Sequence, residues 1–560
     1  MNTKFSAANI FEDVKVESFP RHAFDISYTN SFTCNHGLAY PCLVKNVSPG
    51  DKIDVNSFGR VQLQPLATAT MQNITCYVRY FYVPYRLLWN DWDKFIAQDG
   101  FVETPLLAPY YQLNSANLNV LSQRNGVGGL MDFLNYGIYN FDENNQPIAF
   151  RESARLQFTA FRHLAYWKIW DRYFRDENIQ NTICPESDEV VAGYNHTPST
   201  IDTLLPVAWQ KDYFTTALPW TQKGQPINIG TMFNVTDGTY FLKEKEGDRH
   251  NVKLTGYPYG QQNGSMSNIV GVTDNSNPDV GEGDVWDTWA LGDLQLNTAN
   301  LNSQFSINDL RYANALQRYL ERLALGGNRP AEFYLSMYGV KVDDLRIGDP
   351  YYLGGGKSYV NVTPVTQQSQ TTTGAGGSPQ GTLAGNGNTS VDMSFNDPYY
   401  CQEFGIIMGI FYIRPELNYT QGIPRETQLF SHLDYYNPIF AHLGEEAVKT
   451  SELVFGSAMD NTSEETNNDP TFGYQSRYAY LKHSRNEVHG DLKSTLSPWL
   501  LSYHWDVNRG LPALNSEFIT VDQNYDIFAY DKYDEHHYIV EMHHKIQKES
   551  NMPDFSIPSL

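Results

Sequence analysis

Alternating apolar and polar residues in the first part of the chain predict antiparallel β-strands. Residues 24–28 and 53–55 alternate on either side of a turn-forming segment at 48–52, as strands do when one face packs on a core and the other meets water. A longer strand is predicted from Cys76 to Val83, and Pro84 ends it or places it at an edge because proline cannot donate to a ladder. The aromatic run after Pro84 predicts a helical turn over the end of a sheet.

Two later segments repeat their apolar residues at steps of three or four, which predicts helices. The first, 153–177, carries Leu156, Phe161, Leu164, Trp167, Trp170 and Phe174 on one face, and its arginines are expected to be solvated. The second, 306–325, opens near a capping box, Ser306 with Asp309, and ends at Gly326-Gly327.

Other stretches predict strands and loops. The apolar run 405–413 has the length of a strand buried on both faces and is too short to cross a bilayer, which needs about 20 residues. The stretch 100–150, rich in Asn, Gly, Pro and Tyr, predicts loops. The Gln, Thr, Ser and Gly tract 366–390 predicts a flexible loop. The Gly354-Gly355-Gly356-Lys357-Ser358 run has Tyr351 where a phosphate-binding P-loop needs glycine, so a tight turn with an exposed lysine is expected.

Composition limits the possible functions. The 560 residues are 41% hydrophobic and include 38 tyrosines, which suit a large core and subunit interfaces. The net charge of −23 excludes a protein that binds nucleic acid with its whole surface, although a local basic face remains possible. Five scattered cysteines predict neither a disulfide framework nor a zinc knuckle, and the N-terminus lacks the pattern of a secretory signal. We therefore expect a protein made in a reducing cytoplasm.

Catalytic and metal-binding motifs give little support for an enzyme. The chain has no Gly-x-Ser-x-Gly, His-Glu-x-x-His or dinucleotide motif, so we expect no catalytic residues and no cofactor. Pro278 breaks the calcium-loop pattern that begins at Asp274. The unusual titratable cluster is His536, His537, His543 and His544, a weak metal candidate that is more typical of a wet surface or an interface.

Several ordered segments carry a resemblance to a known family. They are PGD at 49–51, FYVPYRLLWNDW at 81–92, FRHLAYWKIWDRYFRDENIQ at 161–180, EFGIIMGIFYIRP at 403–415, DYYNPIFAHLGEEAV at 434–448 and FGYQSRYAYLKHSRNEVHGDL at 472–492. Together they resemble the major capsid protein of the microviruses, small icosahedral single-stranded DNA phages. The resemblance runs from about residue 21 to 527 and lapses mainly in 100–150 and 225–300.

The resemblance implies a mainly β fold, a single antiparallel eight-stranded jelly roll with long helix- and loop-containing insertions. The expected divisions are an N-terminal arm at 1–19, the first strands at 20–95, a long insertion at 96–350, the remaining strands at 351–530 and a C-terminal tail at 531–560. Within the insertion, 225–300 is expected to be exposed and variable, either as a protrusion that contacts the host or as an inert loop.

The implied function is that of a structural protein of the virion, made and assembled in the bacterial host. Sixty copies, grouped in pentamers, would form a T=1 shell around circular single-stranded DNA. Exposed aromatic residues such as Tyr110, Tyr111, Tyr435 and Tyr436 would supply subunit contacts. The implied partners are the packaged DNA, a small basic DNA-binding protein, a pilot or vertex protein and a host surface receptor, while the residues that contact DNA stay unassigned. The Trp and Tyr content leaves one alternative, a soluble β-rich carbohydrate-binding or glycan-degrading protein.

Overall fold

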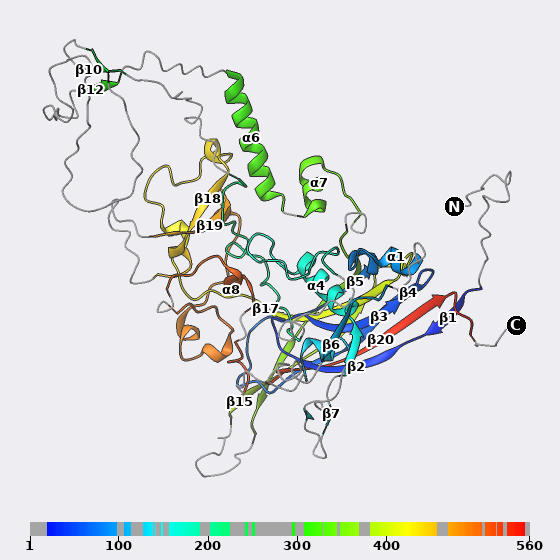
Figure 1. Ribbon diagram of the computed structural model, residues 1–560. Helices are drawn as coiled ribbons and strands as arrows, with labels where there is room; N and C mark the ends of the chain where they lie inside the picture. Colours follow the sequence, from blue (N-terminus) through cyan, green and yellow to red (C-terminus); the bar gives the residue numbers. More distant parts are fainter. Residues whose placement is uncertain are drawn as a thin grey trace, which may run out of the picture. The chain divides into compact units, whose positions relative to one another are not determined.

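The computed structural model (Figure 1) describes residues 20–97, 106–113, 127–137, 140–141, 147–148, 156–190, 202–224, 241–244, 249–251, 294–296, 307–327, 329–343, 348–368, 381–455, 469–506, 510–521, 524–529 and 535–554. The chain divides into two units, one of Met1–Thr221 with Gly326–Leu560 and the other of Gln222–Leu325.

Two antiparallel sheets form the first unit. The seven-stranded sheet follows the order β1 (His22–Asp25), β20 (Tyr538–Ser550), β4 (Lys52–Leu63), β15 (Leu383–Ser394) and β14 (Asn361–Thr366), with β2 (Tyr28–Cys34) also on β20 and β16 (Tyr399–Tyr400) also on β4. The four-stranded sheet follows the order β13 (Tyr351–Tyr359), β5 (Ile74–Pro84), β17 (Gly405–Pro415) and β3 (Tyr40–Val47). This arrangement confirms the mainly β, antiparallel fold and is consistent with a jelly roll.

The alternation of apolar residues places one core against the seven-stranded sheet. Strand β4 alternates buried and exposed residues along most of its length, and β20 does the same in register with it, so that Val61 pairs with Val540. These residues join one apolar cluster with Val78 of the four-stranded sheet. Full burial of each such side chain stabilises the fold by roughly 1.5–3 kcal/mol.

A second core lies on the opposite face of the four-stranded sheet. Strands β5 and β17 are buried on both faces, which confirms the strand predicted at 405–413. Phe81 and Met408 pack in one cluster with Trp167 and Trp170 of α4 (Phe161–Tyr173). The helical turn predicted after Pro84 is present as η1 (Tyr85–Leu87) and α1 (Trp92–Ala97).

Helix α4 differs from the prediction for 153–177. It begins at Phe161, and the preceding residues form β9 (Leu156–Thr159), which pairs with β6 (Tyr110–Leu113). Ten of its thirteen residues are buried. Loops as well as the sheet contact the helix. For example, the Trp170 Nε1–H donates a hydrogen bond to the Pro206 carbonyl oxygen at 2.7 Å.

The C-terminal segment also differs from the prediction. The tail expected at 531–560 contains β20, which lies between β4 on one side and β1 and β2 on the other (Figure 1). The burial pattern is that of a strand with one face on the core, because residues 538–546 alternate strictly between buried and less buried positions.

The glycine run at 354–356 is part of a strand and not a tight turn. It lies in β13, where Gly354 and Gly355 adopt φ angles of 139° and 145° and a register shift marks a bulge. Glycine permits these angles because it lacks a Cβ. Lys357 on the same strand is exposed, as predicted.

The second unit contains the predicted helix and a small sheet. Helix α6 (Ile307–Leu325) follows Ser306 directly and ends before Gly326, as the start and stop residues indicated. Strands β11 (Arg249–Asn251), β10 (Phe241–Glu244) and β12 (Leu294–Leu296) pair in that order. The rest of 225–300, and the arm predicted at 1–19, lie outside the described residues.

Shorter elements complete the first unit. They are α3 (Leu130–Phe133), α7 (Pro330–Tyr338), α8 (Ser516–Ile519), the pairs β7 (Asn140–Phe141) with β8 (Pro147–Ile148) and β18 (Glu445–Lys449) with β19 (Thr471–Ser476), and the short helices η5 (Arg425–Thr427), η6 (Pro438–Phe440), η7 (Thr450–Glu452), η9 (Ala479–Leu481), η10 (Gly490–Lys493) and η11 (Ser497–Trp499).

Candidate functional site

The four histidines named as weak metal candidates have separate environments. His537 is buried, its ring stacks on Tyr525 at 4.3 Å, and its Nδ1 lies 3.0 Å from the Asn35 side-chain oxygen. His536 contacts Thr33 at 2.8 Å. Within the residues that the structure describes, no three His, Cys, Asp or Glu side chains gather as a metal-ligand group.

His543 and His544 lie on β20 and point to opposite faces of the sheet. His543 is half-buried and contacts the Thr29 hydroxyl at 3.1 Å, whereas His544 is fully buried with its Nδ1 2.7 Å from the Ser57 hydroxyl. Burial lowers the pKa of His544 to about 4, because the charged ring loses its hydration. His544 is therefore a neutral core residue at physiological pH.

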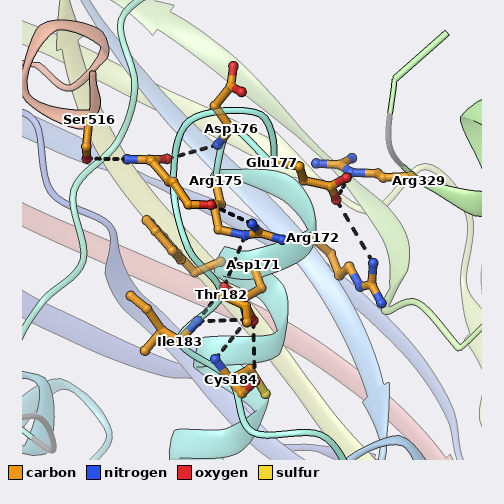
Figure 2. Close-up of polar contacts among 12 residues, drawn as sticks. Asp171, Arg172, Arg175, Asp176, Glu177, Thr182, Ile183, Cys184, Arg329 and Ser516 are labelled. Atoms are coloured by element: carbon orange, nitrogen blue, oxygen red, sulfur yellow. Dashed lines mark hydrogen bonds and ion pairs between the residues drawn. The ribbon is translucent and has the colours of Figure 1, made fainter. Parts of the chain in front are cut away.

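The basic residues at the C-terminal end of α4 are held in a polar network (Figure 2). The buried Asp171 carboxylate accepts hydrogen bonds from the Thr182 hydroxyl at 2.6 Å and from the backbone N–H groups of Ile183 at 3.1 Å and Cys184 at 2.8 Å. Arg175 Nε lies 3.4 Å from the same carboxylate. Arg175 is thus fixed in the structure, which corrects the prediction that the helix arginines are solvated.

A second part of this network joins α4 to the chain before α7 and β13 (Figure 2). Arg172 pairs with Asp349 at 2.9 Å. Figure 2 shows Glu177 beside Arg329, with which it pairs at 3.3 Å. Burial raises the pKa of Asp349, and the positive charge of Arg172 opposes that rise. Through Glu177 the network contacts Arg329, which is the N-cap residue of α7.

An exposed apolar surface lies between η5 and β18. We define the 430–443 surface by its exposed apolar residues, Phe430, Leu433, Tyr435, Tyr436, Ile439 and Leu443. Phe430 is 85% exposed and Ile439 79% exposed. Several exposed large apolar side chains in one short segment are typical of an interaction site.

Polar side chains inside this segment fix its shape. The Asp434 carboxylate accepts hydrogen bonds from the N–H groups of Phe430 at 3.0 Å and Ser431 at 2.7 Å. The Asn437 side chain caps η6 by accepting from the Ile439 N–H at 3.0 Å. The apolar residues are therefore presented outward by an ordered backbone, as an interface requires.

The aromatic residues predicted to be exposed divide into two groups. Tyr435 and Tyr436 are exposed, as predicted, but Tyr111 is fully buried on β6 and packs against Phe158 at 5.7 Å. Loops were predicted over 100–150, so the strand β6 that buries Tyr111 differs from the prediction. The exposed Phe430 and Ile439 were not predicted; their only signal is that they are apolar residues in a segment without a strand or helix period.

Helix α7 adds a further set of exposed rings. None of its nine residues is buried, and Tyr334 and Tyr338 are among the exposed large side chains.

In the described part of the chain, no helix is long and apolar enough to span a membrane.

Comparison with known proteins identifies the family. The family model described as "Capsid protein (F protein)" matches residues 12–112 and 146–560. The unmatched residues 113–145 fall within 100–150, where the resemblance was expected to lapse. The match includes 225–300, where a lapse was also expected. Capsid protein VP1 of Chlamydia phage 1 is 30% identical over 604 residues, covering 99% of this chain and 98% of that protein.

Two further relatives carry the same name. Capsid protein VP1 of Bdellovibrio phage phiMH2K is 29% identical and covers 89% of this chain and 87% of its own length. Capsid protein VP1 of Spiroplasma virus 4 is 27% identical and covers 93% and 92%. These matches favour the capsid interpretation over a carbohydrate-binding or glycan-degrading protein. The chain therefore belongs to the capsid protein (F protein) family of microviruses, and its role is that of a structural virion protein and not of an enzyme.

Proposed function

We propose that this protein is the repeating subunit of a closed T=1 shell, in which sixty copies grouped as pentamers enclose a circular single-stranded DNA genome. The observation that carries the proposal is the ordered 430–443 surface on a chain of the capsid family. Closed symmetric assemblies form when such a surface meets a complementary one on another copy.

The purified protein tests this proposal directly. Light scattering at micromolar concentration should show pentamers or larger bodies, and negative-stain electron microscopy should show round particles. A stable monomer in scattering, with an empty grid, would contradict the proposal.

The negative net charge of the chain limits how far this protein can neutralise the phosphates of the genome. Because the net charge is −23, the subunit cannot neutralise the packaged phosphates with its overall charge. We therefore expect a separate small basic protein in the particle, and a pilot or vertex protein as a further partner. The capsid protein alone should fail to condense DNA at physiological salt, and tight condensation would remove the need for the basic partner.

The segment 225–300 is proposed to reach outward and contact a host surface receptor. Its composition is rich in Gly, Asn and acidic residues, and long surface loops cost only about 0.6 kcal/mol of extra closure entropy per doubling of length. Replacing residues 237–293 with a short Gly/Ser bridge should leave shell assembly intact and abolish adsorption to the host. Normal adsorption would make the segment an inert loop, and loss of particles would make it structural.

A further inference from the structure

The two central strands of the four-stranded sheet each carry a single charged residue, and in both it is arginine. Strand β5 reads ITCYVRYFYVP with Arg79, and β17 reads GIIMGIFYIRP with Arg414. Arg79 pairs with Ile410 and Arg414 pairs with Thr75 in the antiparallel register. Because side chains alternate between faces with a period of two, both arginines project from the α4 side of the sheet.

A cavity of about 540 Å³ opens at these two arginines. Five cationic residues line it: Arg79, Arg175, Lys211, Arg329 and Arg414. Asp176 supplies the one carboxylate of the lining, and the rings of Tyr173, Phe174, Tyr352 and Tyr412 form part of the wall. A concentration of positive charge in a chain of net charge −23 requires a specific explanation.

The cations of the cavity differ in how they are paired. Arg175 and Arg329 are neutralised by Asp171 and Glu177 in the network of Figure 2. These pairs hold two walls of the cavity in place. Of the other three cations, Lys211 is exposed, whereas Arg79 and Arg414 are partly buried and form the charged centre of the cavity.

Arg79 and Arg414 have neutral partners. Arg79 donates to the Tyr352 hydroxyl at 3.0 Å, and Arg414 donates to the Ala208 carbonyl at 3.2 Å while its guanidinium lies 4.9 Å from the Tyr77 ring centre. Among the described residues, no carboxylate lies within ion-pair distance of either arginine, and the buried Nε of Arg414 has no hydrogen-bond partner. A partly buried cation without a counterion is costly, so this geometry favours an anionic ligand.

We propose that this cavity binds a phosphate of the packaged single-stranded DNA, with the adjacent base against the half-buried rings of Tyr173 and Tyr352. The proposal rests on the proposed function, which brings single-stranded DNA to the subunit. Arginine guanidinium groups match phosphate oxygens in a bidentate geometry, and aromatic side chains beside a cationic groove are the usual means of holding single-stranded bases. The mouth of the cavity would then face the genome.

The test measures binding of a fluorescently labelled 15-nucleotide oligothymidylate to the purified full-length protein across a range of salt concentrations. The loss of one phosphate contact to a single strand lowers the slope of log affinity against log salt by about 0.7. Arg79→Gln with Arg414→Gln removes the one contact proposed here, so it should lower the slope by about 0.7 and weaken binding about tenfold. Arg79→Lys with Arg414→Lys, which retains both charges, should keep most of the slope.

Arg60→Gln is the matched control. Arg60 lies on β4 in the other sheet, its side chain is 75% exposed, and it pairs with Glu541, so its loss should leave the slope unchanged. A double variant with the wild-type slope and affinity would overturn the proposal. Displacement of the oligonucleotide by polyglutamate at equal charge concentration, with no preference for DNA, would also overturn it by making the cavity a site for acidic protein segments.

Two further measurements separate this proposal from the proposed function. Thermal melting of the glutamine and lysine variants shows whether each is folded before its binding is compared. Electron microscopy shows whether the wild-type protein forms shells. If shells form and the variants bind as the wild type does, the cavity assignment fails alone; if wild-type shells do not form, the shell proposal fails whatever the oligonucleotide shows.

Discussion

At the scale of single residues, environment decides chemistry more than residue type does. His543 and His544 are neighbours in sequence, yet one contacts a threonine at a half-buried position and the other is fully buried against Ser57. The same contrast separates the paired Arg175 from Arg414, which lacks a described carboxylate partner. The number of histidines or arginines in a sequence does not reveal this difference.

The buried His544 predicts how stability depends on pH. Its folded pKa of about 4 lies below the unfolded value of about 6.5, so the unfolded state binds the proton more tightly and protonation favours unfolding. The free energy of unfolding should fall as pH falls from about 6.5 towards 4, by a contribution on the order of 3 kcal/mol. Urea titrations at several pH values measure it.

His544→Asn should flatten that pH dependence, because asparagine does not titrate and still offers a polar group to Ser57. His543→Asn is the neighbouring control and should leave the dependence close to that of the wild type. Equal slopes in the wild type and the His544 variant would show that other groups cause the acid sensitivity.

At the scale of elements, periodicity predicted the interior of the strands well and their ends poorly. The apolar run at 405–413 and the helix at 306–325 appeared almost as predicted, because burial on both faces and clear start and stop residues leave little choice. Helix α4 began eight residues later than predicted, since Leu156 belongs to a strand whose partner at Tyr110 lies in a segment assigned to loops. Local patterns do not show pairings between distant segments.

The glycine-rich strand β13 gives a prediction at this scale. At Gly355, where φ is 145°, an added Cβ would lie 2.1 Å from the Val78 carbonyl oxygen of β5. Gly355→Ala should therefore destabilise the protein by at least about 2 kcal/mol. Chemical denaturation measures the loss.

The adjacent Gly356 is the matched control. A Cβ there meets the flexible Met393 side chain at 3.2 Å, so Gly356→Ala should cost about 1 kcal/mol or less. Comparable losses in both variants would mean that the strand, and not the close approach at Gly355, is sensitive to substitution.

At the scale of the whole molecule, the sequence identified the family and the fold class but not the surfaces that matter. Ordered motifs along the chain were enough for the resemblance, and the family match extended it. The 430–443 surface and the cavity at Arg79 and Arg414 are made by side chains from distant segments or by exposed residues without a period. Such sites depend on how the chain folds back on itself.

The 430–443 surface predicts a variant that folds but does not assemble. Phe430→Ser with Ile439→Ser removes two highly exposed apolar side chains, so the melting temperature should stay close to that of the wild type while the assembled mass falls in light scattering. Met71→Ser removes a side chain that is 70% exposed elsewhere and should leave the mass unchanged. An unchanged mass in the double variant would assign assembly to another surface.

The position of β20 has a consequence for how the protein is made. The partner of Thr33 beside this strand, His536, is 503 residues later in the chain, so the ribosome must synthesise most of the protein before β2 and β4 can pair with β20. At bacterial rates of 5–20 residues per second this takes roughly 25 to 100 s. During that time the early strands have open edges, and a nascent chain released too soon cannot close the sheet. A chain that is truncated before β20 should therefore fail to complete the seven-stranded sheet.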